Sequence, residues 1–99
     1  MTGGIQLEFI YEKNRIYARN ESGIVVAEVT FPDVDGQTVN INHTFVDDSL
    51  RGQGIAGKLM EAAASTLRRQ NRKACLTCSY AVKWFQNHPE YCDLRTERL

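Results

Sequence analysis

The residue types best suited to chemistry in this 99-residue chain stand together at positions 51–58, where the sequence reads RGQGIAGK. Three glycines and a lysine precede a segment with helical spacing, so backbone N–H groups are expected to converge at a helix N-terminus. Those unpaired donors and the positive end of the helix dipole favour an anion such as phosphate. The stretch fits three phosphate-binding patterns: G-x-G-x-x-G through Gly52, Gly54 and Gly57, most of a P-loop through Gly52, Gly57 and Lys58, and R/Q-x-x-G-x-G/A through Arg51, Gly54 and Ala56.

The surroundings of this stretch disfavour two of the three patterns. A dinucleotide-binding turn needs glycines directly after a strand and an acidic residue about twenty positions on. Residues 47–50 intervene here, and no acidic residue occurs between Glu61 and Glu90. A P-loop needs Ser or Thr after its lysine to hold magnesium, and Leu59 takes that place. The third pattern, a pyrophosphate-binding loop, is the one that fits.

The three cysteines, Cys75, Cys78 and Cys92, provide other reactive groups. An odd number argues against a disulfide framework. The pair Cys75 and Cys78, followed by His88, imitates a zinc site, but a strand directs residues three apart to opposite faces. Ligands on opposite faces cannot share one ion, so we expect separate reduced thiols and no metal.

Period-two patterns in the first half of the chain indicate the strands that must position these groups. They run over residues 6–11, 15–20, 24–31 and 38–46, and turn-forming residues separate them. Short turns between successive strands predict an antiparallel meander. In the last strand, one face is expected to carry Val39, Ile41, His43 and Phe45, and the other Asn40, Asn42 and Thr44.

The second half of the chain changes period. Apolar residues at positions 55, 59, 63 and 67 predict a helix over residues 54–70. A short buried strand is expected over 74–77, and a second helix over 81–87, which must end before Pro89. The predicted order is β-β-β-β-α-β-α, an α+β fold with a mixed sheet in which a meander packs on the long helix and strands 38–46 and 74–77 run parallel.

Length and composition narrow the class of protein. Ninety-nine residues, 42% of them hydrophobic, suit one domain over residues 1–99. Twelve basic and twelve acidic residues cancel, so overall charge does not favour nucleic acid or an anionic membrane. The sequence shows no targeting peptide and no apolar run long enough to span a bilayer, which predicts a cytoplasmic protein without a membrane partner.

From about Thr38 onward, the chain resembles the GNAT superfamily of N-acetyltransferases. The resemblance rests on residues 51–56, on Leu59 in the following helix, and on the strand ending in Thr44-Phe45-Val46. The segments 43–46 and 76–78 resemble those of a small single-domain subgroup of the superfamily. The predicted order of elements agrees with a shortened version of that fold, and the resemblance covers roughly the last sixty residues.

What the resemblance implies is an acetyl-CoA site. Arg51 would supply charge or brace the loop, and Gly52 would allow close approach of the ligand. Small residues suit such a loop because a bulky Cβ would keep a diphosphate from the amides. Phe45 and Val46 would pair their backbone with the pantetheine arm, which lies like an added strand between two splayed strands. The pyrophosphate would be bound by the amides of Gln53, Gly54, Ile55 and Ala56.

Two positions depart from what the resemblance implies for catalysis. Many GNAT enzymes carry a glutamate as general base on the strand before the loop, where Asn40 stands here. Many also use a tyrosine of the last helix to protonate the leaving thiolate, and Phe85 stands near that place. The usual pair of catalytic residues therefore cannot be identified from this sequence.

The sequence offers His43 and Cys78 in their place. His43 precedes the loop, and Cys78 ends the next strand, which should be a neighbour of the first. A histidine and a helix start, expected near Ser79, favour a cysteine thiolate, which could carry the acetyl group as a thioester. Alternatively, His43 could deprotonate the amine directly. Both residues could equally be structural, His43 as a half-buried side chain and Cys78 as a small hydrophobe.

These observations favour an acetyl-CoA-dependent N-acetyltransferase that acts on a small-molecule or protein amine. The acceptor site of so short a chain would be open or completed by a partner subunit, as in a homodimer. One alternative is a module that binds acetyl-CoA or CoA without turning it over. Another is a nucleic-acid or protein interaction domain that uses the basic cluster Arg68, Arg69, Arg72 and Lys73.

Overall fold

The computed structural model describes residues 7–97. The order and type of the predicted elements are confirmed, except that the fourth strand is divided in two. The first predicted strand began at Gln6, which lies outside the described residues. The elements are β1 (Ile10–Glu12), β2 (Arg15–Arg19), β3 (Val25–Thr30), β4 (Thr38–Ile41), β5 (His43–Val46), η1 (Asp48–Leu50), α1 (Ile55–Arg69), β6 (Lys73–Leu76), α2 (Ser79–Gln86) and η2 (Pro89–Leu94), where η marks a 3-10 helix.

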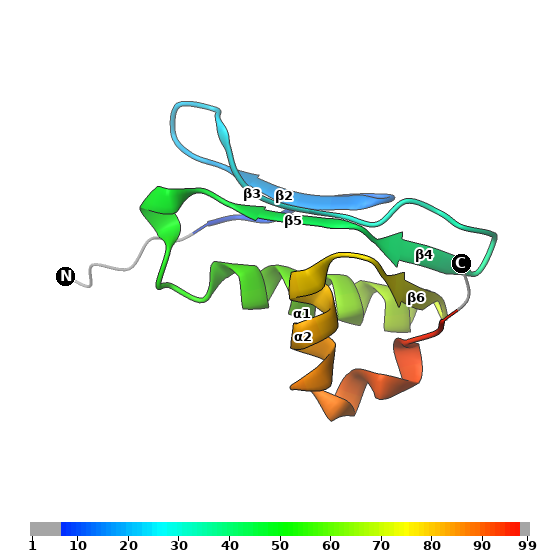
Figure 1. Cartoon of the computed structure of the whole chain (residues 1–99). Helices are drawn as coiled ribbons and strands as arrows, with labels where there is room; N and C mark the ends of the chain where they lie inside the picture. The colour runs from blue at the N-terminus through cyan, green and yellow to red at the C-terminus, as the bar shows by residue number, and fades with distance from the viewer. Residues whose placement is uncertain (1–6, 98–99) are drawn as a thin grey trace.

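The strands form an antiparallel sheet that is continued by a parallel pair (Figure 1). The antiparallel sheet has the order β1-β2-β3-β5, and β4 pairs with β6 in parallel. The meander predicted from the short turns and the parallel pairing of the two later strands are both confirmed. Because β5 is the last strand in its sheet, one of its edges has no strand beside it.

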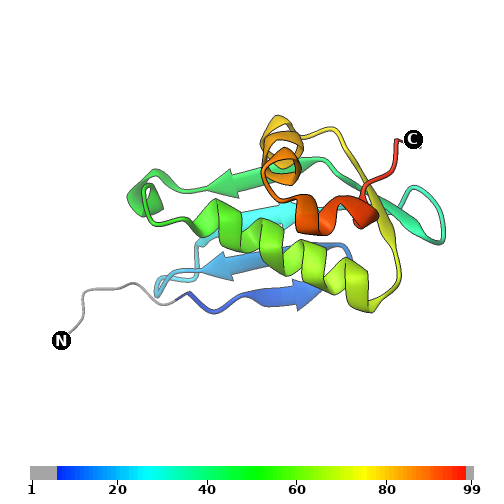
Figure 2. The ribbon, with the colours of Figure 1, turned by 90° about the horizontal axis from the view of Figure 1, so that it is seen from below.

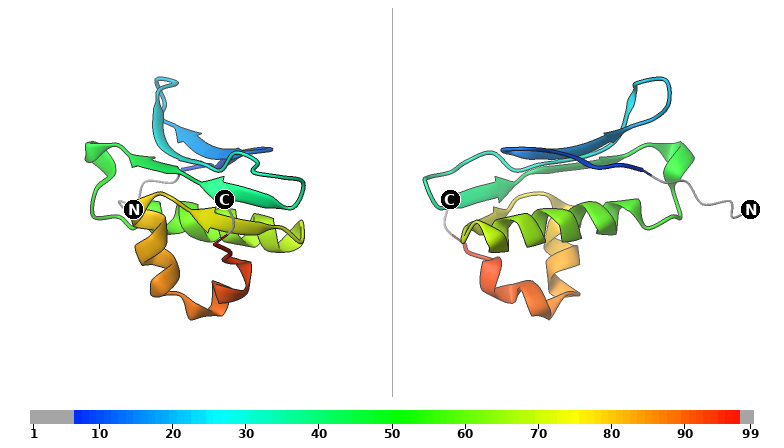
Figure 3. Two further views of the ribbon diagram at one scale, coloured as in Figure 1. Left: turned by 45° about the vertical axis from the view of Figure 1, so that its right-hand side comes forward. Right: turned by 180° about the vertical axis from the view of Figure 1, so that it is seen from behind.

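The helices cover one face of the sheet (Figure 3). Seen from that side, α1 lies over the sheet and runs roughly along the strands, with α2 and η2 beside it (Figure 2). Its apolar stripe packs on the inward side chains of β2 and β3, and each large apolar side chain buried in this way contributes about 1.5–3 kcal/mol. The fully buried residues of this interface include Ile16, Ala27, Val29, Leu59, Met60, Ala63 and Leu67.

The strand predicted over residues 38–46 is broken at Asn42, which belongs to neither β4 nor β5. The Asn42 side chain accepts a hydrogen bond from the Thr30 hydroxyl at 2.6 Å, and its backbone N–H donates to the Thr30 carbonyl. The extra residue reverses the faces that follow, because successive strand residues alternate sides. Val39 and Ile41 are therefore buried, whereas His43 and Phe45 are exposed, and the prediction that these four share a face is wrong.

The opposite face of the sheet carries no helix of the described chain (Figure 3). Tyr17 nevertheless stays buried on it, because the guanidinium groups of Arg15 and Arg19 lie over its ring, 3.7 and 5.1 Å from the centroid. In register with Tyr17 across the sheet lie Glu28 and then Phe45. We call this surface the open face; its side chains are aromatic and charged.

Candidate cofactor and acetyl-transfer site

The glycine-rich loop leads from η1 into α1 at one end of the molecule (Figure 1). Gly52 and Gly54 adopt φ angles of 84° and 72°, the left-handed region that other residues enter at a cost. The space where a Cβ of either glycine would stand is open, with no atom within 4 Å. Backbone conformation, rather than packing, therefore requires glycine at these two positions, and the loop is open to a ligand.

The N-terminus of α1 presents unpaired backbone donors at this loop. Gly54 is the N-cap residue and has no side chain to bond the first N–H groups of the helix. The first intrahelical bond that it accepts comes from the Lys58 N–H at 3.1 Å. The amides of Ile55, Ala56 and Gly57 therefore have no acceptor within the helix, an arrangement suited to an anion.

Hydrogen bonds of the preceding turn hold the loop in place. The Asp47 carboxylate accepts hydrogen bonds from the hydroxyl and the amide of Ser49, and these bonds, that of the hydroxyl first, lower the pKa of Asp47. Arg51 Nε lies 2.8 Å from Asp48 Oδ1 in an exposed ion pair. This ion pair ties the start of the loop to η1, and the charge of Arg51 is shared with Asp48.

A gap opens beside β5 where the parallel pair ends. The last paired residues of β4 and β6 are Ile41 and Leu76, and the Ile41 carbonyl then accepts from the amides of both Thr77 and Cys78 at 3.2 Å. Beyond this point the chain turns into α2, while β5 continues alone towards η1 (Figure 1). The free backbone edge of β5, which includes Phe45 and Val46, can therefore accept an added extended group.

Cys78 stands where this gap begins. It is the N-cap residue of α2, its side chain is half-buried, and its Sγ atom lies 3.5 Å from Thr44 Oγ1. The break at Asn42 turns the Thr44 side chain to the same side as Val46, towards the core. A thiol and a hydroxyl thus meet on the helix side of β5.

His43 lies on the open face instead. Its Nε2 atom is 3.8 Å from Glu28 Oε1, and the other Glu28 oxygen is bonded by Arg15. The described contacts of His43 and Cys78 are with different partners, because the reversal at Asn42 directs neighbouring β5 side chains to opposite faces. Sequence reasoning missed both Glu28 and Thr44. Glu28 comes near His43 because β3 pairs with β5, and Thr44 contacts Cys78 because the break at Asn42 reverses the faces of β5.

The two positions that depart from the expected catalytic pair are accounted for by local contacts. The Asn40 amide oxygen accepts a hydrogen bond from the Thr77 hydroxyl at 2.9 Å, which ties β4 to the end of β6. Phe85 is buried in the core and meets the Trp84 ring edge-on, with 5.2 Å between centroids. Both residues have structural roles in this fold.

A hollow of about 370 Å³ lies between the first turns of α1 and one side of α2. It adjoins the glycine loop, with which it shares Gly54. The volume is in the range of small-molecule sites. Sequence reasoning did not find it, because its walls come from two helices distant in the sequence. Its lining residues are Gly54, Gly57, Lys58, Glu61, Tyr80, Trp84 and His88.

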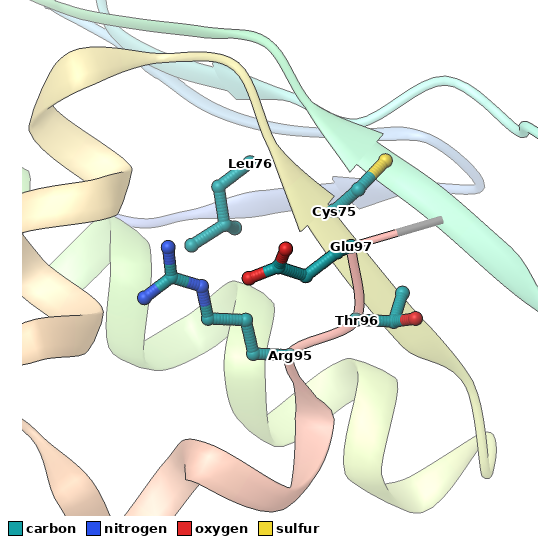
Figure 4. A pocket seen from close by; sticks show the side chains of 5 residues that line it. All are labelled: Cys75, Leu76, Arg95, Thr96 and Glu97. Atoms are coloured by element: carbon teal, nitrogen blue, oxygen red, sulfur yellow. The ribbon is translucent and has the colours of Figure 1, made fainter. Parts of the chain in front are cut away.

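A second hollow, of about 250 Å³, lies beside β6 (Figure 4). There the C-terminal segment runs along β6, with Arg95 bridged to Ala74 and the Thr96 amide bonded to the Ala74 carbonyl. This edge of β6 is opposite to the edge that pairs with β4, so the hollow is separate from the gap beside β5. In Figure 4 the Arg95 and Glu97 side chains extend to the side on which Leu76 lies.

The cysteines are separate thiols among the described residues. Cys75 is buried and its thiol donates to the Val39 carbonyl at 3.3 Å, and burial raises the pKa of this thiol. Cys92 is exposed on η2. Within residues 7–97, no group of three or more His, Cys, Asp or Glu side chains is arranged to hold a metal ion.

Most of the basic cluster is bonded within the chain. Arg68 pairs with Asp93 and lies 4.7 Å over the Tyr91 ring. Arg72 pairs with Asp33. Lys73 donates to a backbone carbonyl of residue 93. This bonding disfavours the interaction-domain alternative, because these cations already neutralise internal partners. No helix in the described part of the chain is long and apolar enough to cross a membrane.

Comparisons with known proteins indicate the family of the chain. A family model described as GCN5-related N-acetyl-transferase matches residues 15–94. Protein NATD1 of Xenopus tropicalis is 38% identical over 63 residues, which are 64% of this chain and 58% of that protein. Protein NATD1 of Mus musculus is 31% identical over 87 residues, 88% of this chain and 79% of that protein. The match thus spans little more than half of the frog relative.

Solved structures show the same fold. A GCN5-like protein from Staphylococcus aureus superposes with a TM-score of 0.76 at 32% identity, over 94% of this chain and 91% of that one. The GNAT family protein YhbS from Escherichia coli, solved in complex with CoA, has a TM-score of 0.51 at 30% identity, over 59% of this chain and 35% of that one. From the family match over most of its length, we conclude that the chain belongs to the GCN5-related N-acetyltransferase family.

Proposed function

We propose that the protein binds acetyl-CoA along the glycine loop and the free edge of β5, and transfers the acetyl group to an amine with Cys78 as its carrier. The observation that carries this proposal is the contact between Cys78 and Thr44 where the gap beside β5 begins. From there β5 leads towards the loop that opens α1. One elongated ligand would thus connect a reactive thiol to an anion site.

The cofactor would be held mostly by backbone groups. The amides of Gln53, Gly54, Ile55 and Ala56 would bond the pyrophosphate, and Gly52 would keep the approach open. The amides and carbonyls of Phe45 and Val46 would pair with those of the pantetheine arm, as an added strand does. The related YhbS from Escherichia coli is solved with CoA, which supports CoA as the ligand here.

The reaction would proceed in two balanced steps. The Cys78 sulfur attacks the thioester carbon of acetyl-CoA, the bond from that carbon to the CoA sulfur breaks, and the thiol proton of Cys78 ends on the CoA sulfur. A neutral amine then attacks the acetyl-Cys78 carbon. Its nitrogen forms the amide bond, the bond to Cys78 breaks, and a proton of the amine returns to the Cys78 sulfur. No redox partner is needed.

His43 would act on the acceptor. It lies on the open face beside the Glu28 carboxylate, opposite to the side on which Cys78 contacts Thr44. An acceptor that approaches from the open face would meet the imidazole first. A neutral imidazole can take a proton from its ammonium form, which leaves the neutral amine that attacks acetyl-Cys78. The two catalytic candidates would then serve different steps rather than form one pair.

Mass spectrometry after incubation with acetyl-CoA, without an amine, tests the carrier role. We expect one acetyl group on Cys78 that hydroxylamine removes, as it removes a thioester. Cys78→Ala should lose this label, whereas Cys92→Ala, which alters another accessible thiol, should keep it. A label that persists at the same level in Cys78→Ala would show that Cys78 is not the carrier.

A module that binds acetyl-CoA without turnover is the second candidate. The structural roles of Asn40 and Phe85 favour it, because neither residue can act as an acid or base. Binding of CoA without any acetyl-Cys78 and without transfer to amines would support this function. The amine acceptor, a cytoplasmic location and a homodimer that completes the acceptor site remain proposals.

A further inference from the structure

The open face carries a group of charged and aromatic side chains next to the proposed acetyl carrier. Glu28 and Phe45 are opposite each other in the register of β3 and β5, and His43 is the diagonal neighbour of Glu28 on the same face. Thr44, which lies between His43 and Phe45, contacts Cys78 on the other side of β5. An acceptor that approaches Cys78 from the open face would therefore pass over the surface around Glu28.

Negative charge is in excess around Glu28. The guanidinium of Arg15 serves two carboxylates, because its Nε donates to Glu28 Oε2 and its Nη1 lies 3.6 Å from Glu12 Oε1. One cation between two carboxylates leaves one negative charge without compensation. The other cation of this face, Arg19, stands at the opposite end of β2 and donates to the Gly23 carbonyl. The surface around Glu28 therefore favours a cationic ligand.

One oxygen of the Glu28 carboxylate is available to such a ligand. Oε2 is bonded by Arg15, whereas Oε1 lies 3.8 Å from His43 Nε2, a separation longer than a hydrogen bond. The side chain of Glu28 is 21% exposed and that of His43 is 54% exposed, so a small cation can reach both from the open face. An ammonium group there would donate to Glu28 Oε1 and, in the tautomer with an unprotonated Nε2, to His43.

Phe45 adds an apolar surface beside this carboxylate. It is 39% exposed on the open face, directly across from Glu28. Tyr17, on the other side of Glu28, is already covered by Arg15 and Arg19, so it offers no ring face to a ligand. An aromatic ring attracts both a cation and the apolar body that carries it. A carboxylate and an exposed ring side by side thus suit an amine with an apolar body.

We propose that the acceptor is a small amine with an apolar body and no carboxylate beside its nitrogen, and that Glu28 selects it. The ammonium form binds Glu28 Oε1, and the apolar body lies on Phe45. One N–H bond of the ammonium then breaks, its proton moves to His43 Nε2, and the neutral amine attacks acetyl-Cys78. The Glu28 charge repels the carboxylate of a free amino acid. This assignment rests on the proposed function, since it requires an acetyl group on Cys78.

Discharge of acetyl-Cys78 by phenethylamine and by free phenylalanine tests this assignment, because the two amines differ only in a carboxylate. Protein that carries the acetyl group is freed of acetyl-CoA and mixed with each amine, and mass spectrometry follows the loss of the group. The wild type should reach half-maximal rate at about tenfold lower concentration of phenethylamine than of phenylalanine, the usual strength of one charged contact. Glu28→Gln, which still accepts from Arg15, should need about tenfold more phenethylamine and lose this preference.

Glu12→Gln is the matched control, because it removes the other carboxylate of Arg15 on β1, at the edge of the sheet farthest from β5. It should keep the wild-type preference. Glu28→Gln should also keep the wild-type rate of Cys78 acetylation by acetyl-CoA, which a general loss of structure would lower.

The possible failures are distinguishable. No preference in the wild type, a preference that survives in Glu28→Gln, or equal losses in Glu28→Gln and Glu12→Gln would overturn the role of Glu28 while the transfer itself stands. If Cys78 is not acetylated, or if no amine discharges it, the proposed function fails and this assignment fails with it.

Discussion

The glycine loop at the start of α1 and the junction around Cys78 are built on different principles. The loop offers backbone amides at positions whose conformation requires glycine, and its one charged side chain is shared with Asp48. The junction depends on the side chains of Thr44 and His43, which the strand break at Asn42 directs to opposite faces, and of Cys78, which stands at the start of α2. The loop is thus a local feature of the chain, whereas the junction is a product of tertiary structure.

This difference separates binding from chemistry. Backbone amides bind a diphosphate in many contexts, since the helix terminus supplies both donors and dipole. Transfer of an acetyl group requires particular atoms at fixed positions, and small displacements cost rate. Changes in the loop should therefore alter affinity for CoA, and changes in the junction should alter reactivity at unchanged affinity.

The largest effect is expected from Gly54→Val. A β-branched residue at a φ of 72° costs about 1–3 kcal/mol, so the start of α1 must rearrange and its amides lose their alignment. We expect affinity for CoA to fall by about tenfold or more, measured by calorimetric titration.

Gly23→Val is the matched control for that change. Gly23 has a φ of 83°, and no atom lies within 4 Å of its Cβ position, but it stands in the turn between β2 and β3. Its substitution should bring the same backbone strain and leave CoA affinity as in the wild type. Equal loss of affinity in both variants would mean that general destabilisation, rather than the loop, limits binding.

A smaller effect is expected from Thr44→Val. The substitution keeps the shape of the side chain and removes the hydroxyl that contacts the Cys78 thiol. One hydrogen bond contributes about 1 kcal/mol, so the rate of Cys78 acetylation should fall about fivefold while CoA affinity is kept. Quenched-flow mass spectrometry measures this rate.

Thr30→Val provides the comparison for the junction. It removes a hydroxyl that bonds Asn42 on the open face, so the acetylation rate should stay at the wild-type value. If Thr44→Val lowered CoA affinity and left the rate unchanged, the division between a binding loop and a reactive junction would be refuted.

The smallest effect at neutral pH is expected from Asp33→Asn, which is remote from the loop and the junction. Hydrogen bonds from Arg72 first, and then Asn14, lower the pKa of Asp33 from 3.8 to about 2. A lowered pKa means that this carboxylate stabilises the fold above pH 3.8, and that its contribution is lost as the pH falls through about 2. Thermal melts should show less acid sensitivity in Asp33→Asn over that window.

The same change in an Arg72→Met background checks the cause. Without the guanidinium, Asp33→Asn should alter the acid sensitivity much less than in the wild type. An undiminished effect would assign the dependence to another group. The Asp33 and Arg72 variants should keep the CoA affinity of the wild type at neutral pH, because neither residue lies at the loop or the junction.

Much of the fold could be predicted from the sequence because its signals are local. The helical spacing of Ile55, Leu59, Ala63 and Leu67 predicted α1 to within one residue at each end. The glycines at its start indicated an anion site, since they occupy a strand-to-helix turn. The bounds of β2 and β3 were predicted to within one residue for the same reason, because alternation within one strand needs no knowledge of its neighbours.

The junction could not be predicted, because strand periodicity assumes an unbroken strand. Residues 39–45 alternate without interruption in the sequence, and nothing in that pattern marks Asn42 as a break. The break arises because β4 pairs with β6 and β5 pairs with β3, so the chain changes partners there. The contacts of His43 with Glu28 and of Cys78 with Thr44 follow from this pairing, which only the folded chain contains.

An NMR titration of the ¹⁵N-labelled protein with CoA tests most directly whether one ligand connects the two regions. The backbone amides of Gly54, Ile55 and Ala56 and those of Phe45 and Val46 should shift together and fit a single dissociation constant. Shifts confined to the loop would instead indicate a simple anion site. Such a result would contradict the proposal that the cofactor reaches the junction.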